Sequence, residues 1–454
     1  MPDPNHDASR KAPVTPTGRI IRGGRVIDRD GERVADVAIA PDGVILAVGV
    51  DLDPAALGLA DPELLDAAGC VVAPGLVDIH THLREPGREE AETVETGSRA
   101  AALGGYTAVV AMPNTEPTID SVGVVRQVLD AGVAAGICDV RVAGAITIDR
   151  KGEALAPLAE MAELGVRMFT DDGCGVQDDR LMRRALEYAS GLPVPVTLAQ
   201  HCEVEVLSEG GHMHEGEWSS RLGIPGIPAE AEELMVFRDI ALARLTGARV
   251  HLQHLSTAGS VQLVREAKAK GLPVTAEATP HHFTLTHAEV ASYDPVFKVN
   301  PPLRTEADVA AVRAGLVDGT IDAIATDHAP HTSDLKEAPF DHAPCGMLGL
   351  ETALALGITE LVEPGLLSLA ELLALMSWQP AAIAGIEAVH GRPIAAGEPA
   401  HLVVFDPTQP WTVDPTALAS RSSNTPYAGR EVRGRVRHTL LCGVPMVRDG
   451  KAQR

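Results

Sequence analysis

Two histidines two residues apart are the most distinctive chemical feature of this sequence. His80 and His82 follow the apolar run 71–77, which predicts a β-strand. Side chains at positions i and i+2 of a strand share a face, so both imidazoles would point the same way. Imidazole nitrogens bind zinc, and Arg84 could hold an anionic substrate beside a metal. Such pairs also occur on solvated loops, and the pair alone does not decide between these readings.

A second pair, His212 and His214, provides an internal comparison. It lies among Glu and Gly residues, and no apolar strand leads into it. We therefore predict a surface loop there, without a metal.

Apolar runs alternate with Ala-, Leu- and Glu-rich segments between residues 73 and 390, which we take as one domain. Eight such runs, each followed by a helical pattern, predict a (β/α)8 barrel. The first run begins at Val71, and the others are 107–112, 140–145, 166–170, 196–200, 249–253, 274–278 and 321–326. The chemistry of such barrels takes place where the strands end.

Residues that can bind a metal follow several of these runs. They are His80 and His82 after the first, Asp171 and Asp172 after the fourth, His201 after the fifth, His254 after the sixth and Asp327 after the eighth. Only one Asp of the adjacent pair should face the others. Four histidines and two aspartates suffice for two metals that share a carboxylate, bridge a hydroxide nucleophile and polarise a carbonyl. This predicts hydrolysis, or its reverse, at an amide-like carbon, with Asp327 as general acid and base.

The two ends of the chain share a different texture. Short β-branched runs separated by turn residues fill 18–72, and similar runs return in 391–454. We expect the ends to pair into one small β-sandwich domain beside the barrel, which gives an α/β fold overall. Residues 1–17 are polar and contain prolines, and we expect a disordered extension there.

The bulk composition excludes several classes of function. A net charge of −24 argues against nucleic acid and anionic membranes, which select clustered Lys and Arg. No apolar run approaches the roughly 20 residues that span a bilayer, and no secretory signal is recognisable. The six cysteines are scattered without a CxxC pair, which argues against disulfides and thiolate zinc sites. We expect a cytoplasmic protein.

The motifs together resemble the amidohydrolase superfamily and, within it, dihydroorotase of the bacterial type I class. The resemblance covers nearly the whole chain after the extension. DIHTHLREPG and ATDHAPHTSDLK resemble two signatures of that family. Between and around them, in the family's order, stand AMPNTEPTID, MFTDDG, QHCE, HLQHLST, EATPHHFTLT, KVNPPLR and GLETAL.

This resemblance implies a zinc-dependent, reversible cyclisation of N-carbamoyl-L-aspartate to (S)-dihydroorotate and water, a step of pyrimidine (UMP) biosynthesis. It implies one or two zinc ions per subunit. The implied ligands are His80, His82 and Asp327 on one ion, His201 and His254 on the other, and Asp172 as the bridge. Many relatives bridge with a carboxylated Lys. We align that Lys with Arg167, whose guanidinium stays protonated and cannot form a carbamate.

The substrate residues also follow from the resemblance. Arg84, Asn114 and His331 match positions that hold the substrate carboxylate, while Asn300, Cys345 and Gly346 match positions that contact the ring; His82 belongs to the substrate site as well as the metal site. Cys345 departs from the family, where an aromatic or aliphatic residue is more usual. The side chain at Cys345 is therefore not expected to recognise the ring.

We predict packing or supporting roles, and no metal binding, for the other histidines and polar residues near the strand ends. We expect His281 and His282 to buttress the end of the seventh strand, and His251 to pack on the outer face of the sixth. Cys202 and Glu203 would support His201 from behind, with Glu203 as a partner for its imidazole.

The resemblance also implies possible partners and two alternative functions. A small-molecule substrate, a homo-oligomer (most simply a dimer) and a complex with aspartate transcarbamoylase are family-level expectations. One rival is another cyclic amidohydrolase: dihydropyrimidinase, hydantoinase or allantoinase. These typically carry the bridging Lys and need no Arg for a ring carboxylate. The other rival is a non-catalytic dihydroorotase-like subunit of aspartate transcarbamoylase, but such subunits lose metal ligands that this sequence retains.

Overall fold

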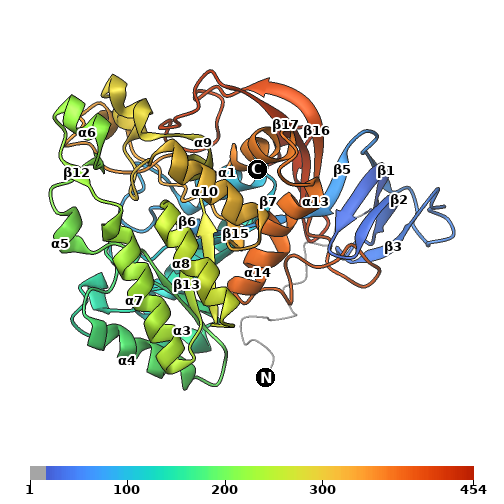
Figure 1. The fold of residues 1–454 in the computed structure, drawn as a ribbon. Coiled ribbons are helices and arrows are strands. Elements are labelled where there is room, and N and C mark those ends of the chain that lie inside the picture. The colour runs from blue at the N-terminus through green and yellow to red at the C-terminus, as the bar shows by residue number, and fades with distance from the viewer. Residues whose placement is uncertain (1–16) are drawn as a thin grey trace.

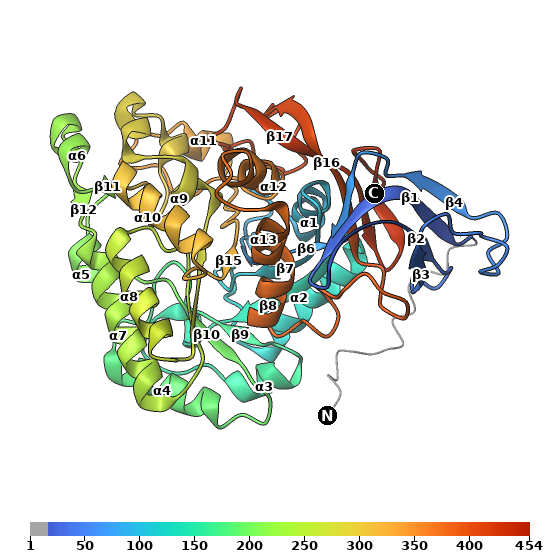
Figure 2. The same cartoon turned by 45° about the vertical axis from the view of Figure 1, so that its right-hand side comes forward.

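A computed structural model describes residues 17–454 of the chain, which form a barrel and an adjoining β-domain (Figure 1). The predicted disordered extension, 1–17, lies outside the described residues except for its last position. In both views the barrel and its helices lie on the left, and strands from the two chain ends meet on the right (Figure 2).

The barrel consists of a parallel sheet of eight strands in sequence order, which confirms the predicted fold. Its strands are β6 (Leu76–Thr81), β7 (Tyr106–Ala111), β8 (Asp139–Gly144), β9 (Met168–Phe169), β10 (Thr197–Gln200), β13 (Val250–Leu252), β14 (Val274–Ala278) and β15 (Ala323–Ile324). An isolated parallel bridge between Thr81 and His328 joins the last strand end to the first. Parallel strands that are covered on both faces are continuous apolar runs in the sequence, so these strands could be predicted from it.

Helices and short turns connect and cover these strands. The α-helices are α1 (Val94–Leu103), α2 (Val122–Ala135), α3 (Leu158–Glu163), α4 (Asp179–Ser190), α5 (Glu205–Ser208), α6 (Glu217–Leu222), α7 (Glu230–Thr246), α8 (Ala258–Ala269), α9 (Pro280–Thr284), α10 (Glu306–Val317), α11 (Ser333–Lys336), α12 (Ala353–Gly357), α13 (Leu369–Leu373) and α14 (Gln379–Ile383). Three 3-10 turns are η1 (Ile148–Arg150), η2 (His287–Ser292) and η3 (Pro295–Phe297); two π-helical turns are η4 (Ile358–Val362) and η5 (Ala374–Trp378). A two-stranded ribbon, β11 (Met213–His214) and β12 (Gly226–Ile227), lies outside the barrel.

The β-domain is one nine-stranded sheet built from both chain ends. Its strands are β1 (Arg19–Asp28), β2 (Gly31–Ile39), β3 (Ile45–Gly49), β4 (Glu63–Asp66), β5 (Val71–Pro74), β16 (Leu402–Thr412), β17 (Glu431–Leu441), β18 (Val444–Arg448) and β19 (Lys451–Ala452). β5 joins the two halves, because it pairs in parallel with β1 and antiparallel with β16. The two ends therefore pair as predicted.

The apolar run from Val71 to Val77 is two strands and not one. It divides at Gly75 into β5 of the β-domain and β6 of the barrel. A Cβ at Gly75 would lie 2.2 Å from the side chain of Thr107, so only glycine fits this close approach of two strands. The chain passes from one domain to the other at this point.

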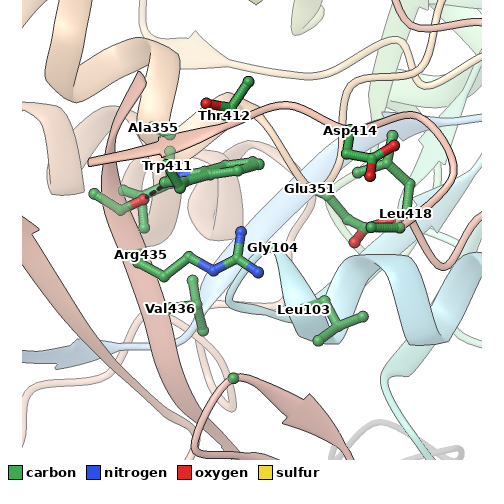
Figure 3. Close-up of a pocket in the computed structure, with 14 residues that line it drawn as sticks. Leu103, Gly104, Glu351, Ala355, Trp411, Thr412, Asp414, Leu418, Arg435 and Val436 are labelled. Carbon is green, nitrogen blue, oxygen red and sulfur yellow. Dashed lines mark hydrogen bonds between the residues drawn. The ribbon is translucent and has the colours of Figure 1, made fainter. Parts of the chain in front are cut away.

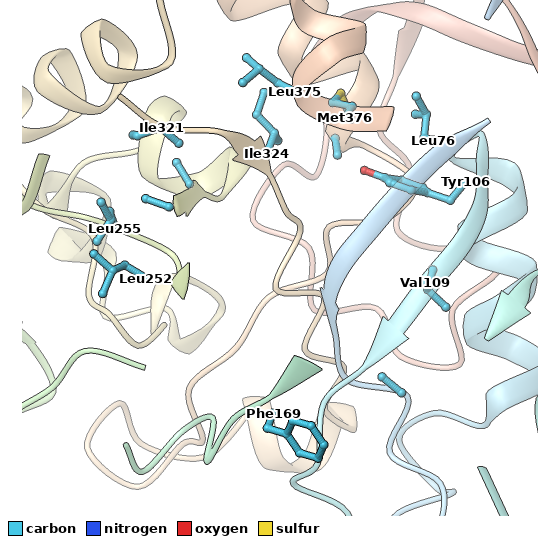
Figure 4. Packing of buried hydrophobic residues seen from close by; sticks show 14 of the residues in the cluster. Leu76, Tyr106, Val109, Phe169, Leu252, Leu255, Ile321, Ile324, Leu375 and Met376 are labelled. Carbon is cyan, nitrogen blue, oxygen red and sulfur yellow. The ribbon is translucent and has the colours of Figure 1, made fainter. Parts of the chain in front are cut away.

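Apolar side chains between the strands and the surrounding helices form the main core (Figure 4). Phe169, Leu252 and Ile324 come from three different barrel strands, and Met376 from η5 packs in the same cluster. A separate cluster is rich in alanine, including Ala108 from β7, Ala143 from β8 and Ala199 from β10. Among the described residues, no helix is long and apolar enough to cross a membrane.

Candidate metal and substrate site

Buried histidines and aspartates from five strand ends converge on one point of the barrel. His80, His82 and Asp172 offer ligand atoms within 4.8 Å of one another, and so do Asp172, His201 and His254. Asp172 is common to both groups. The strand ends therefore bring together all four predicted histidines around one carboxylate.

Asp327 completes this cluster. Its Oδ1 lies 2.8 Å from His82 Nε2 and 3.5 Å from His80 Nε2. Asp172 Oδ1 lies 3.3 Å from His80 Nε2 and 3.7 Å from His254 Nε2. Both carboxylates are buried, so each faces several imidazoles in a region that excludes solvent.

The donor atoms fit a bound metal ion. His80 Nε2, the nitrogen that faces both carboxylates, is buried without a hydrogen-bond partner, which is costly for a polar atom unless something else satisfies it. Ligands held about 2.1 Å from a tetrahedral zinc ion lie roughly 3.4 Å apart, close to the separations between His80, His82 and the two carboxylates. The spacing of these atoms therefore matches that of metal ligands. Imidazole nitrogens and carboxylate oxygens together are donors that suit zinc.

Residues inside the barrel strands orient these ligands, and the sequence reading missed them. Glu277 Oε1 lies 2.6 Å from His80 Nδ1, which leaves Nε2 to face the carboxylates. Asp78 accepts hydrogen bonds from the backbone N–H (2.9 Å) and hydroxyl of Thr326, which ties β6 to the end of β15 next to Asp327. The sequence did contain a signal for Asp78 and Glu277, because each is a carboxylate within an apolar strand and a buried carboxylate needs partners.

The charges of the cluster reinforce one another. Burial alone would lower the pKa of His80, but Asp172, Glu277 and Asp327 outweigh it and hold that pKa well above the usual value. Burial alone would raise the pKa of Asp327, yet His80 and His82 keep it below its usual range. The excess of negative charge around these imidazoles favours a cation at their centre.

Three residues of the site have strained backbones. Arg84, His254 and Asp327 adopt φ angles of 61°, 34° and 46°, in a region that non-glycine residues rarely occupy. Each such residue costs on the order of 1–3 kcal/mol, and strain of this kind gathers at functional sites. All three lie just beyond strand ends, where the surrounding structure can hold them.

A pocket of about 330 Å³ opens beside the cluster. It is lined by His82, Arg84, Arg88, Asn114, Asp172, Gly173, His201, His254, Val299, Asn300, Asp327, Ala329, His331, Cys345 and Gly346. Every predicted site residue except His80 thus lines it, and His80 lies behind, in the cluster. Arg88 is an additional cation that the sequence reading did not single out.

Arg84 provides the main positive charge in this pocket. Its Nε donates to the carbonyl of Pro330 at 3.1 Å, and Nη2 lies 3.3 Å from His331 Nε2. Burial lowers the pKa of Arg84 only to about 10, so the guanidinium stays charged at neutral pH. Burial and the neighbouring Arg84 lower the pKa of His331 to about 2, so His331 is neutral. Among residues 17–454, no carboxylate forms an ion pair with Arg84.

The remaining predicted residues lie around the same pocket. Asn114 Oδ1 is 2.8 Å from His82 Nδ1, and Asn300 Nδ2 is 3.3 Å from His201 Nε2. The carbonyl of Cys345 lies 2.7 Å from His331 Nε2, and burial raises the pKa of its thiol. Gly346 has a φ of 141°, and a Cβ there would lie 2.9 Å from His331 Nε2. The backbone at 345–346 therefore approaches the pocket closely, as expected for this loop.

The two adjacent aspartates point in different directions. Asp171 accepts from the backbone N–H groups of Ile146 and Thr147 at 2.8 and 3.0 Å, away from the imidazoles. Asp172 is the one that joins the cluster. Arg167 precedes β9, and its Nη1 donates to the carbonyls of Ala162 and Val166 at 2.8 and 3.0 Å, so it does not join the cluster. It lies at the opposite end of the strand from Asp172.

The predictions of an outward-facing His251 and of a surface loop at His212 and His214 were wrong. His251 does not pack on the outer face, because its Nε2 lies 3.0 Å from Glu277 Oε2, behind His80. Met213 and His214 are buried in β11, where Arg304 Nη1 lies 3.1 Å from His214 Nδ1. Neither His251 nor His214 belongs to a candidate metal group among residues 17–454.

The supporting residues lie as expected. Glu203 Oε2 lies 3.7 Å from His201 Nε2, and Cys202 is buried. His282 Nδ1 lies 2.8 Å from the hydroxyl of Thr279 at the end of β14.

Comparisons with known proteins agree with this geometry. Residues 69–260 match a family model described as dihydro-orotase-like. The chain is 52% identical to a dihydroorotase from Streptomyces coelicolor over 95% of this chain and 99% of that protein. It is 50% identical to a dihydroorotase from Mycobacterium tuberculosis, with the same coverage of both chains.

Solved structures show the same fold. A dihydropyrimidinase from Brevibacillus agri superposes with a TM-score of 0.80 at 26% identity, covering 96% of each chain. An L-hydantoinase from Arthrobacter aurescens has a TM-score of 0.84 at 24% identity, covering 96% of this chain and 98% of that one. The curated relatives match about twice as many positions as these structures do, and over almost the same length. The chain belongs to the dihydroorotase family.

Proposed function

We propose that this protein is a zinc-dependent dihydroorotase, which interconverts N-carbamoyl-L-aspartate and (S)-dihydroorotate plus water in the biosynthesis of UMP. One observation carries the choice of substrate: the buried, charged guanidinium of Arg84 lines the pocket without a carboxylate partner among the described residues. A buried cation without a counterion is costly, so the pocket calls for an anionic ligand. Dihydroorotate carries a carboxylate on its ring. The family membership supports the same substrate.

The proposed metal ligands fall into two sets that share Asp172. His80, His82 and Asp327 would hold one zinc ion, and His201 and His254 the other, with one or two ions bound per subunit. The two groups of candidate ligands that meet at Asp172 support this division. Zinc bound there would lower the pKa of a water molecule toward neutrality and polarise a carbonyl oxygen.

Asp327 is the proposed general base and acid. Its depressed pKa leaves it ionised at neutral pH, and it lines the pocket next to the ligand cluster. In the hydrolytic direction it accepts a proton from the water that attacks the ring carbonyl. It then delivers that proton to the ring nitrogen, which leaves as the amide bond breaks. Cyclisation reverses both transfers.

Substrate binding divides between the two sides of the pocket. We propose that Arg84, Asn114 and His331 hold the carboxylate, because guanidinium and neutral donors together give charge and direction. Asn300 and the backbone at Cys345 and Gly346 would contact the ring. His82 reaches the substrate side through its contact with Asn114.

The test is an assay in both directions, with and without added zinc. The protein should convert carbamoyl aspartate and dihydroorotate and should leave dihydrouracil, which lacks the carboxylate, unchanged. Arg84→Met should lower kcat/KM for dihydroorotate by about 100-fold or more, because a charge-assisted contact is lost. Preferential turnover of dihydrouracil would instead favour a dihydropyrimidinase. Absence of turnover in zinc-loaded protein would favour the non-catalytic subunit.

The proposed assembly is a cytoplasmic homodimer, with aspartate transcarbamoylase as a further partner. An apolar stripe on α7 supports self-association: Leu234, Phe237 and Leu245 are 53%, 60% and 61% exposed. They recur at helical spacing and so share one face. Light scattering should give twice the monomer mass, and a monomer at all concentrations would contradict the dimer.

A further inference from the structure

A second cavity of about 150 Å³ lies between the barrel and the β-domain (Figure 3). Its walls come from the end of α1, the residues around α12, strands β16 and β17, and the segment after β16. It shares no lining residue with the pocket beside the histidine cluster. Ligand binding in this cavity is therefore independent of the proposed dihydroorotase activity, whereas any effect of the ligand on turnover rests on that activity.

Arg435 points into this cavity from β17 (Figure 3). Its guanidinium carbon lies 4.5 Å from the centre of the Trp411 ring, which covers one face of the group. Trp411 is itself fixed, because its Nε1–H donates to the carbonyl of Gly434 at 2.9 Å. Within residues 17–454, no carboxylate forms an ion pair with Arg435 and no side-chain hydrogen bond engages its guanidinium. The donor edge of a positioned cation is thus available to a ligand.

Glu351 faces the same space and forms no ion pair with Arg435 among the described residues, although the positive charge of Arg435 opposes the rise in its pKa. Burial raises its pKa to about 7, so much of the population is uncharged at neutral pH. Its Oε1 accepts from the backbone N–H of Ala419 at 2.7 Å, and the backbone N–H of Ser420 also contacts the carboxyl group. A carboxyl group has about four lone pairs, so it can accept a further hydrogen bond from a ligand. Asp414 is at the exposed edge, where its Oδ1 is engaged by Thr416 at 2.9 and 2.7 Å. The interior is therefore positive at Arg435 and carries a hydrogen-bonding carboxyl opposite.

We propose that this cavity is a second ligand site, for a small carboxylate of about amino-acid size that also carries an N–H group. The carboxylate would take two parallel N–H donors from Arg435, the geometry that guanidinium groups favour. The ligand N–H would donate to Glu351, and its aliphatic part would pack against Leu103 and Val436.

A chain of contacts leads from this cavity to the proposed active site. Ser420, next to Ala419, donates through its hydroxyl to Glu92 Oε2, which lies 3.3 Å from His328 Nε2. The carbonyl of His328 accepts from the backbone N–H of His82 at 2.9 Å, and His328 follows Asp327 in sequence. A ligand that moves Glu351 therefore acts on the segment holding Asp327, and we extend the proposal to a change in turnover.

The binding test uses N-acetylglycine as the probe and its neutral analogue N-acetylglycinamide as the control. Tryptophan emission should change saturably with N-acetylglycine, titrated to about 20 mM because so small a ligand reaches only about millimolar Kd. Trp411→Phe should abolish the change, which assigns it to the cavity. N-acetylglycinamide should produce no saturable change.

Two arginines on the same strand provide matched variants. Arg435→Met should weaken binding at least tenfold, and Arg435→Lys should weaken it less. Arg433→Met should bind the probe as wild type does, since Arg433 pairs with Glu363 at 3.0 Å outside this cavity. Equal binding to wild type and Arg435→Met, or no saturable change in wild type, would overturn the site. Thermal melts of the three arginine variants test whether they are folded. None of these readouts needs turnover, so they remain valid if the proposed function fails.

The coupling is tested by the rate of dihydroorotate hydrolysis at saturating substrate. N-acetylglycine should change kcat at least twofold in wild type and Arg433→Met, and should leave Arg435→Met unaffected. An unchanged kcat in ligand-saturated wild type would overturn the coupling. Equal inhibition of wild type and Arg435→Met would place the effect in the active-site pocket and also count against it.

Discussion

At the scale of single residues, we propose two roles for Asp327, metal ligation and proton transfer, and a single substitution can separate them. Asp327 is close enough to His82 and His80 to share a metal with them, and it also lines the substrate pocket. Asparagine has the same shape and keeps one ligand oxygen, but it does not take up a proton at neutral pH. The substitution therefore removes proton transfer more completely than it removes ligation.

Asp327→Asn should lower kcat by about 10³-fold, within the range for loss of a general acid–base, while the folded structure is retained. Steady-state kinetics, circular dichroism and zinc content should be measured on the same preparation. Retained zinc with lost turnover is the expected pattern. Wild-type turnover would remove Asp327 from the proton-transfer role, and activity restored by excess zinc would reduce it to a ligand.

The neighbouring pair Asp171 and Asp172 allows a matched comparison of metal binding. Asp172→Ala should lower the zinc bound per subunit and lower kcat, because it removes the carboxylate common to both groups of ligands. Asp171→Ala removes a carboxylate that accepts only from Ile146 and Thr147 on this side of the barrel, so it should mainly destabilise the fold. Zinc analysis after gel filtration distinguishes the two. A larger loss of zinc from Asp171→Ala would contradict the assignment.

The sequence predicted the histidines of the cluster because each follows an apolar strand. It could not choose between Asp171 and Asp172 without the family resemblance, since the choice depends on the path of the backbone after β9. Glu277 was missed for a different reason. Its role depends on His80, which is distant in sequence, and only the closed barrel places them 2.6 Å apart.

At the scale of elements, the shortest strands are those that rely most on packing. β9 has only two residues, Met168 and Phe169, so few backbone hydrogen bonds hold it between β8 and β10. Phe169 is fully buried in the main core. Its ring lies against Gly144, where a Cβ would be only 2.9 Å from the ring. The strand that leads to Asp172 is therefore fixed largely by one aromatic side chain.

Phe169→Ala should lower the free energy of unfolding by about 3–5 kcal/mol, because it leaves a cavity that the surrounding strands cannot fill. Urea denaturation followed by circular dichroism measures the change. Tyr188→Ala is the control, since Tyr188 on α4 is 41% exposed, and it should remain near wild type. Equal stability of Phe169→Ala and wild type would show that β9 is held by other contacts.

The ribbon containing His214 shows where prediction from local pattern failed. Gly and Glu residues around it indicate an exposed loop, yet Met213 packs with Val290 and Phe340. Those partners are remote in sequence, and nothing in the local pattern specifies them. The missed division at Gly75 has a related cause, because the residues on both sides are equally apolar and belong to different sheets.

At the scale of the whole molecule, the barrel and the β-domain are joined by more than the central strand β5. Asp139 at the start of β8 pairs with His390, which precedes the return of the chain to the β-domain, at 2.9 Å. Arg141 contributes a second contact to the same oxygen, also at 2.9 Å. This buried group fixes the base of the barrel to the segment that leads into β16.

Asp139→Asn should destabilise the protein by about 3 kcal/mol at neutral pH, because it removes the carboxylate that pairs with the buried His390 and the half-buried Arg141. Burial alone would raise the pKa of Asp139, but Arg141 and His390 depress it well below its usual value. A depressed folded-state pKa means that the contribution is fully present above the unfolded pKa of about 3.9. It is lost as the pH falls toward the folded-state value.

The difference in unfolding free energy between wild type and Asp139→Asn should therefore be constant from neutral pH down to about pH 4 and shrink below it. Denaturant titrations at a series of pH values measure this difference directly. Asp149→Asn is a suitable control, because Asp149 pairs at 2.8 Å with the solvent-exposed Lys151 and should show no measurable effect. A difference that grows as the pH falls would mean that Asp139 is protonated in the folded protein, and that the attachment at the base of the barrel is not ionic.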